Sequence, residues 1–153
     1  MARRAKRVEV AIVIAAPPVL VFDILADPRN HPRIDGSGTL TSLIFGPERL
    51  SMGARFGMRM RMGIPYRMTN LVTVFSEGSE IGWRHVGRHV WRYSLTPLGP
   101  ESTRVAEIFE WDRAPLGPIY PAAGVIARNL MAMRRTLGAL QELAEGEHRR
   151  AST

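Results

Sequence analysis

Residues 8–38, VEVAIVIAAPPVLVFDILADPRNHPRIDGSG, decide the fold because they carry several structural signals in a fixed order. Apolar side chains recur at every second position from Val8 to Ile14, and this period of two predicts a strand. Pro17 and Pro18 end the strand, and because proline is tolerated in the first turn of a helix, they can also begin one. A further helical turn is expected at residues 29–34, ahead of a turn rich in glycine and serine. The chain therefore begins with a strand and two short helices.

Alternating segments and one long helix make up the remainder of the chain. Turns that contain glycine, proline or serine separate six further strands, which we expect at residues 39–45, 54–62, 66–75, 80–86, 90–98 and 103–112. The apolar period then lengthens to three or four residues, which predicts one long helix from Pro118 to Glu145. The economical packing is an α+β fold in which a seven-stranded curved antiparallel sheet wraps around the long C-terminal helix.

The register of the hairpin that begins at residue 80 can be argued from the faces of its side chains. Opposed residues of an antiparallel hairpin share a face, and both Arg84 and Arg92 are expected to face water. A two-residue loop would pair Arg84 with a tryptophan, whereas a three-residue loop at residues 87–89 avoids this. The three-residue loop predicts the pairs Arg84–Arg92, Trp83–Tyr93 and His85–Trp91.

The net charge of +7 is concentrated near the two ends of the chain. Residues 1–6 are expected to form a basic N-terminal tail, residues 7–145 a single domain, and residues 146–153 a C-terminal tail. The remainder is nearly neutral, and basic tails alone favour solubility or weak binding to polyanions, so nucleic acid is not an expected partner. A protein–protein or nucleic-acid module remains an alternative, and it would use the arginines of the outer face: Arg59, Arg61, Arg84, Arg92 and Arg104.

The composition argues against cysteine chemistry and against a membrane-spanning segment. The chain has no cysteine, which excludes disulfides, thiolate metal sites and cysteine nucleophiles. The longest apolar run near the N-terminus, Val10–Ala16, is too short to cross a bilayer. We therefore expect a cytoplasmic protein with no integral membrane segment. The oligomeric state is not indicated by the sequence.

The inner face of the predicted sheet is rich in methionine and aromatic residues. Methionine is unbranched and adaptable, so a row of methionines suits a pocket that accepts varied apolar shapes, although plain core packing is the alternative. The side chains expected to line such a pocket are Phe56, Met58, Met60, Met68, Asn70, Trp83, His85, Trp91, Tyr93, Glu107 and Phe109 from the strands, and Ile126 and Leu130 from the helix.

Glu107 and His85 are the candidate catalytic residues. Glu107 has the parity of Val105 and Phe109, so it should point inward, where an unpaired carboxylate is costly and often marks a site. Pairing with an arginine or proximity to solvent would give it a structural role instead. His85 could act as a polar hook or a general acid or base. No metal site is expected, since no third ligand has suitable spacing, and no nucleotide-binding or hydrolase motif is present.

Three segments of the chain resemble a known family. Residues 8–38, residues 80–99 (EIGWRHVGRHVWRYSLTPLG) and residues 102–111 (STRVAEIFEW) resemble the SRPBCC (START-like) superfamily, more specifically its polyketide cyclase/dehydrase-like group. The resemblance covers residues 7–145. It implies a helix-grip fold that holds a hydrophobic ligand between sheet and helix. Members bind lipids, polyketides, sterols or plant hormones, some are cyclases or dehydratases, and they share no catalytic motif that could be transferred here.

These observations lead to one functional expectation and one alternative. The protein is expected to bind a small apolar molecule, such as a lipid or polyketide, in a cavity between the sheet and the long helix. The alternative is a cyclase/dehydratase-like enzyme that acts on such a ligand without a metal or nucleotide cofactor. Alternate turns of a meander lie at one end of the sheet, so the mouth is expected at residues 63–65, 87–89 and 112–118.

Overall fold

The structure is a computed structural model, and it describes residues 6–85, 89–111 and 124–153. Within these ranges the chain forms a seven-stranded antiparallel sheet with strand order β1-β7-β6-β5-β4-β3-β2. The strands are β1 (Arg7–Ile14), β2 (Leu40–Phe45), β3 (Arg55–Met62), β4 (Ile64–Ser76), β5 (Glu80–Arg84), β6 (Val90–Gly99) and β7 (Ser102–Glu110). The helices are α1 (Pro18–Ala26), the short 3-10 turn η1 (Pro28–Asn30), α2 (His31–Ile34) and α3 (Val125–Ala151).

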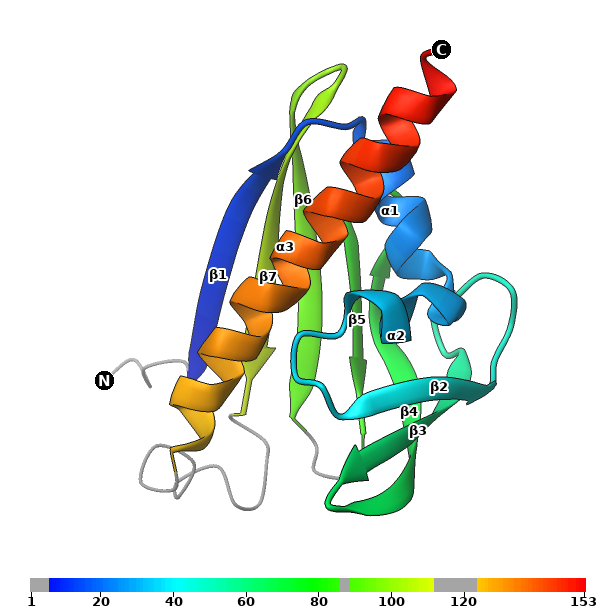
Figure 1. Cartoon of the computed structure of the whole chain (residues 1–153), viewed down its shortest axis with the longest axis vertical. Coiled ribbons are helices and arrows are strands. Elements are labelled where there is room, and N and C mark those ends of the chain that lie inside the picture. The colour runs from blue at the N-terminus through cyan, green and yellow to red at the C-terminus, as the bar shows by residue number, and fades with distance from the viewer. Residues whose placement is uncertain (1–5, 86–88, 112–123) are drawn as a thin grey trace.

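All the helices lie on one face of the curved sheet. Helix α3 crosses that face diagonally, with α1 beside its C-terminal half and α2 beside its middle (Figure 1). Helix α3 packs against β1 and β7 and also contacts α1 and α2. This arrangement is the helix-grip fold, and the expected fold class is confirmed.

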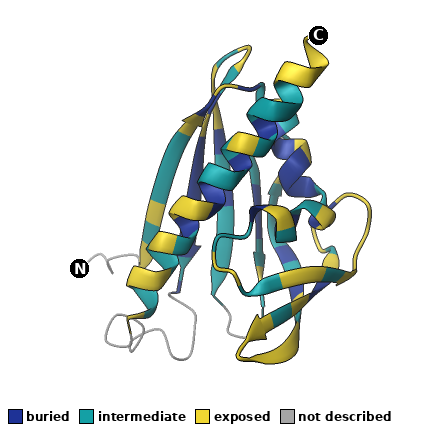
Figure 2. Ribbon diagram, in the orientation of Figure 1, coloured by how far each residue is buried: buried dark blue, intermediate teal, exposed yellow. Residues whose placement is uncertain are grey.

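The core lies between the sheet and the helices, where the buried segments of α1 and α3 face the buried segments of the strands (Figure 2). One turn explains how α2 is held against α3. A Cβ atom on Gly36 would collide with the backbone of Ala132, so only glycine permits this approach. The Gly36 backbone N–H then donates to the Thr136 hydroxyl at 2.8 Å. None of the described helices combines the length and apolarity that crossing a membrane requires.

The predicted register of the β5–β6 hairpin is wrong by two residues. Trp83 lies opposite Trp91, not Tyr93, and Arg92 lies opposite Gly82, not Arg84. Arg92 forms ion pairs with two carboxylates, those of Glu80 at 3.3 Å and Glu110 at 2.7 Å. The expected register would have placed two arginines directly opposite one another, which is destabilising. The parity of the strands is unchanged, so the predicted inner and outer faces stand; residues 86–88 lie outside the described residues.

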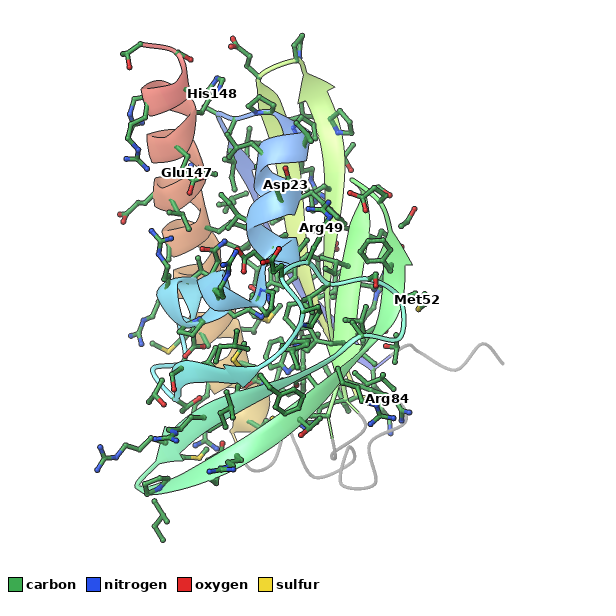
Figure 3. The ribbon with its side chains drawn as sticks, turned by 90° about the vertical axis from the view of Figure 1, so that its right-hand side faces the viewer. Asp23, Arg49, Met52, Arg84, Glu147 and His148 are labelled. Atoms are coloured by element: carbon green, nitrogen blue, oxygen red, sulfur yellow. The ribbon has the colours of Figure 1, made fainter. Side chains whose placement is uncertain are left out.

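Helix α3 ends later than expected. It continues past Glu145 to Ala151, so residues 146–151 are helical. Tertiary contacts hold this last part. Glu145 Oε1 accepts from the Ala15 backbone N–H at 3.0 Å. His148, in the last turns of the helix (Figure 3), places Nε2 3.2 Å from Glu101 Oε1. The expected helix start at Pro118 and the expected mouth segment at residues 112–118 lie outside the described residues.

The turn between β3 and β4 is tighter than expected. The sequence predicted a turn of three residues at 63–65, but β3 runs to Met62 and β4 starts at Ile64. Gly63 alone makes the connection, with φ of +77°, a conformation that favours glycine. The two strands therefore pair up to their tips and form one long hairpin.

Candidate functional site

A buried acid–phenol pair lies at the centre of the inner face. Tyr93 of β6 and Glu107 of β7 are directly opposite in register. The Tyr93 hydroxyl donates to Glu107 Oε1 at 3.1 Å, and both side chains are buried. The inward position expected for Glu107 from its parity is confirmed, while its role stays a prediction.

The second carboxyl oxygen of Glu107 makes no hydrogen bond with any described residue. Glu107 Oε2 is one of two buried side-chain polar atoms in the described chain that lack a partner. The other is the hydroxyl oxygen of Thr73, in β4, where the register between β4 and β5 shifts. A buried oxygen without a partner loses its interaction with water and gains nothing in return. An unsatisfied carboxyl oxygen in an apolar interior is therefore a point where a ligand could bind.

Burial governs the protonation of this pair. Loss of water contact raises the pKa of Glu107 to about 8; the hydrogen bond from Tyr93 opposes this, and the charge of Asp35 adds to it. Burial, together with the neighbouring Glu107, raises the pKa of Tyr93 well above its ordinary value. At neutral pH most Glu107 carboxyl groups therefore carry a proton. With Oε1 accepting from Tyr93, the proton on Oε2 makes that oxygen a hydrogen-bond donor.

A first aromatic group lies on the β3 side of the pair. The His31 ring stacks on Trp83 with centroids 4.7 Å apart, and its edge packs on Phe56 at 5.3 Å. Trp83 in turn lies 5.8 Å from the Tyr93 ring. His31 Nε2 is 2.8 Å from the carbonyl oxygen of Leu25, so the neutral ring donates its proton there. Burial lowers the pKa of His31 to about 4 and keeps the ring neutral.

His31 is a member of the inner face that sequence reasoning missed as a site residue. It begins the four-residue helix α2, and Ile34, three positions later, is also buried. Residues three apart on a helix share a face. The spacing of His31 and Ile34 within the expected helical turn was therefore the available signal.

A second aromatic group lies on the other side of the pair, toward the start of α3. Phe109 lies 4.5 Å from Trp91 and 5.6 Å from Trp111, with Met133 of α3 packed against them. The His85 ring is 3.8 Å from that of His89, which is 5.2 Å from Phe109. The expected pairing of His85 with Trp91 is therefore wrong, because β5 ends at Arg84 and His85 faces His89. Burial lowers the pKa of His85 to about 4, and that of His89 to about 4 with a smaller effect from His85.

The structure divides the expected pocket residues between two clusters. Phe56, Met58 and Tyr93 belong to the larger one, with Met60 and Trp83 packed against it. Phe109 belongs to the smaller one, with Trp91, Ile126 and Leu130 packed against it. Asn70 is buried opposite Phe56 in register, and Met68 is half-buried opposite Met58. Glu107 lies on β7 between Val105 of the larger cluster and Phe109 of the smaller one.

Two surface hollows in the described part of the chain are lined by other residues. One, of about 330 Å³, involves Arg33, Glu142 and Arg150 beside α2 and α3. The other, of about 240 Å³, lies at the β3–β4 hairpin between Arg59 and Arg67. Across the described ranges, no group of three or more His, Asp or Glu side chains is arranged to hold a metal ion.

A curved antiparallel sheet that grips a long C-terminal helix defines the START-like class of proteins. Within that class, residues 5–145 match the family model described as "Polyketide cyclase / dehydrase and lipid transport". The chain belongs to this family, and the resemblance to the polyketide cyclase/dehydrase-like group is confirmed.

Relatives and similar structures agree with this assignment. An uncharacterized protein of Mycobacterium tuberculosis is 36% identical over 143 residues, covering 89% of this chain and 63% of the relative. The chain thus spans less than two thirds of that relative's length. The crystal structure of the Zhui aromatase/cyclase from a Streptomyces species is similar, with a TM-score of 0.65, 16% identity and coverage of 91% of this chain and 95% of that one.

A polyketide cyclase-like protein from Corynebacterium glutamicum, solved by NMR, is similar with a TM-score of 0.58 and 23% identity, covering 96% of this chain and 95% of that one. At these low identities the two structures show the fold alone. Family and fold together suggest a role in binding a hydrophobic ligand.

Proposed function

We propose that this protein binds a small hydrophobic molecule at the inner face of its sheet, and that Glu107 and Tyr93 hold a polar group of that molecule. The observation that carries the proposal is Glu107 Oε2, which is buried and makes no hydrogen bond with the described residues. Leaving such a group unpaired costs free energy, and a ligand atom that pairs with it recovers that cost. The aromatic groups on either side supply apolar contact for the remainder of the ligand.

The protonation state of Glu107 specifies the kind of polar group that fits. With a pKa of about 8, the carboxyl group is mostly protonated at neutral pH and donates from Oε2. The matching ligand atom is an acceptor, such as a carbonyl or hydroxyl oxygen. A ligand carboxylate fits less well when Glu107 itself ionises, because two like charges would then meet in an apolar site.

A second candidate function is catalysis of a cyclase/dehydratase type, and the same carboxyl group favours it. A general acid or base works best with a pKa near the operating pH, and that of Glu107 is about 8. In a dehydration, the carboxyl group gives its proton to a leaving hydroxyl group, which departs as water. The carboxylate so formed then removes a proton from the neighbouring carbon, so that a double bond forms and Glu107 is restored.

Substitutions at the pair test the proposal and separate the two functions. An environment-sensitive apolar dye should bind saturably to the folded protein and be displaced by fatty acids or aromatic polyketides. Tyr93→Phe and Glu107→Leu should each weaken binding of a displacing polyketide by about 1–3 kcal/mol, because each removes a hydrogen bond of the buried pair. Glu107→Gln keeps an acceptor and a donor at this position, so it should retain binding but could not transfer a proton. His85→Asn tests whether the second aromatic group contributes.

Glu110→Gln provides the matched control, since Glu110 lies on the same strand but pairs with Arg92. This control should bind like the wild type. Unchanged affinity in Glu107→Gln, together with a loss of turnover of about 100- to 10,000-fold, would favour the enzyme. Absence of saturable binding to any apolar probe, or equal affinity in the wild type, Tyr93→Phe and Glu107→Leu without turnover, would contradict the proposed function.

A further inference from the structure

The tip of the β3–β4 hairpin exposes large apolar side chains. Ile64 is 77% exposed and Met62 is 64% exposed, and Tyr66 is also exposed. Met62 and Ile64 are directly opposite in register, and their parity places them on the same face as Tyr66. The hairpin extends beyond the helices, and its end is exposed (Figure 2). An exposed group of apolar side chains of this kind typically marks a surface that interacts with a partner.

The same hairpin carries only positive charges. Between Leu50 and Ser76 the sequence contains four arginines, Arg55, Arg59, Arg61 and Arg67, and no acidic residue. All four are exposed, and no ion pair involves them in the described part of the chain. Other arginines of this protein differ: Arg49, for example, is held by Asp23 at 2.7 Å and by Glu77 (Figure 3).

Two of these arginines directly oppose one another. Arg59 of β3 and Arg67 of β4 are paired in register, on the outer face of the hairpin. Like charges at opposed positions are destabilising unless an anion lies near them. The surface hollow of about 240 Å³ lies between them and is also lined by Pro65 and Tyr66. The arrangement therefore favours a negatively charged partner that contacts arginine and apolar side chains together.

We propose that the β3–β4 hairpin docks this protein onto an anionic lipid membrane. Met62, Ile64 and Tyr66 enter the boundary between headgroups and acyl chains, while Arg59 and Arg67 bind lipid phosphate groups. A nucleic acid would match the arginines but leave the apolar tip in water. An acidic protein would need a groove to receive a projecting hairpin, whereas lipid molecules can rearrange around the inserted side chains.

The location of the hairpin tip relates membrane docking to the proposed ligand binding, although docking does not depend on that function. The hairpin projects from the same end of the molecule as the N-terminal end of α3 (Figure 1). Docking would turn that end of the inner face toward the membrane, where an apolar ligand could be exchanged. The residues that dock and the residues that bind ligand are different, so the two proposals can fail separately.

Vesicle binding by the full chain tests the proposal. The protein should co-sediment with vesicles of phosphatidylcholine and phosphatidylglycerol, much less with phosphatidylcholine alone, and less as salt increases. Ile64→Ser should weaken binding to the anionic vesicles about tenfold, because the apolar contact is lost. Arg59→Ala and Arg67→Ala should each weaken it about fivefold.

The opposite end of the sheet offers matched controls. Leu98 is 55% exposed near the β6–β7 turn, and Arg104 is exposed on the outer face of β7. Leu98→Ser and Arg104→Ala should bind vesicles like the wild type. In a further variant, Ile64→Trp, fluorescence should shift to shorter wavelength when anionic vesicles are added.

Three results would overturn the docking proposal: no binding to anionic vesicles, equal losses in the hairpin and control variants, or no fluorescence shift. Retained dye binding in Ile64→Ser would show that the inner face is intact and that only docking is lost. Loss of polyketide binding in Glu107→Leu with normal vesicle binding would be the converse result, and it would leave the docking proposal supported.

Discussion

Strand β7 carries two buried polar residues on its inner face, and they differ in how they are satisfied. Near the start of the strand, the Thr103 hydroxyl donates to the carbonyl oxygen of Ala16 at 2.8 Å and is fully buried. Four positions along, Glu107 is buried with one oxygen bonded to Tyr93 and the other without a described partner. Thr103 connects the strand to the chain segment between β1 and α1. Glu107 can still form a hydrogen bond through Oε2 that none of its described neighbours makes.

This difference separates a structural polar group from a candidate binding group. A buried polar atom with a good partner contributes to stability, and one without a partner reduces it. The Thr103 end, closed by α1, should therefore carry stability and no ligand contact. The Glu107 region should carry ligand contact at some cost in stability.

The largest effect is expected at the closed end. Phe22 of α1 is buried and packs edge-on against Phe75, with ring centroids 5.8 Å apart. Phe22→Ala should reduce the free energy of unfolding by about 3–5 kcal/mol, because the cavity cannot be filled. Urea unfolding followed by circular dichroism measures this. Val19→Ala, at an exposed position of the same helix, should change it by less than about 0.5 kcal/mol, and equal effects of the two substitutions would contradict the expected role of α1.

The next effect concerns pH and Glu107. The ordinary pKa of the carboxyl group is 4.5 and the folded value is about 8. Between pH 6.5 and pH 8 the unfolded group is ionised while the folded group keeps most of its proton, so stability falls as pH rises. The expected loss of unfolding free energy is about 2 kcal/mol over this interval.

Three histidines, His31, His85 and His89, change stability in the opposite direction. Burial lowers the pKa of each from 6.5 to about 4, so stability is lost as pH falls through 6.5, and most of this effect lies below the interval from pH 6.5 to pH 8. Urea unfolding at several pH values provides the measurement. Glu107→Gln should abolish the decline above pH 6.5, and an equal decline in the variant and the wild type would place its source elsewhere.

The smallest effect is expected at Thr103. Thr103→Val keeps the shape of the side chain but removes the donor to Ala16, and should cost about 1–2 kcal/mol of unfolding free energy. Affinity for apolar ligands should not change, in contrast to Tyr93→Phe. Urea unfolding measures the loss of stability, and dye titration measures the affinity. A loss of affinity in Thr103→Val would contradict the distinction between a structural Thr103 and a ligand-binding Glu107.

The β5–β6 hairpin shows where prediction from sequence succeeded and where it stopped. The alternation of residues assigned Trp83, Trp91 and Tyr93 correctly to the inner face. The pairing itself failed, because Arg92 is fixed by Glu80 on one neighbouring strand and Glu110 on the other. A local sequence pattern does not predict which carboxylates will lie beside an arginine once three strands have assembled.

The sequence by itself determined the order of the elements and the face on which each side chain lies. Periods of two and of three to four residues are local properties, and the period of two along β7 is enough to assign Glu107 to the interior. Tertiary structure alone decided which side chains of the inner face meet: His31 with Trp83, and Tyr93 with Glu107. The physical reason is that periodicity specifies a direction from the backbone, whereas a hydrogen bond requires two distant segments to arrive within about 3 Å of one another.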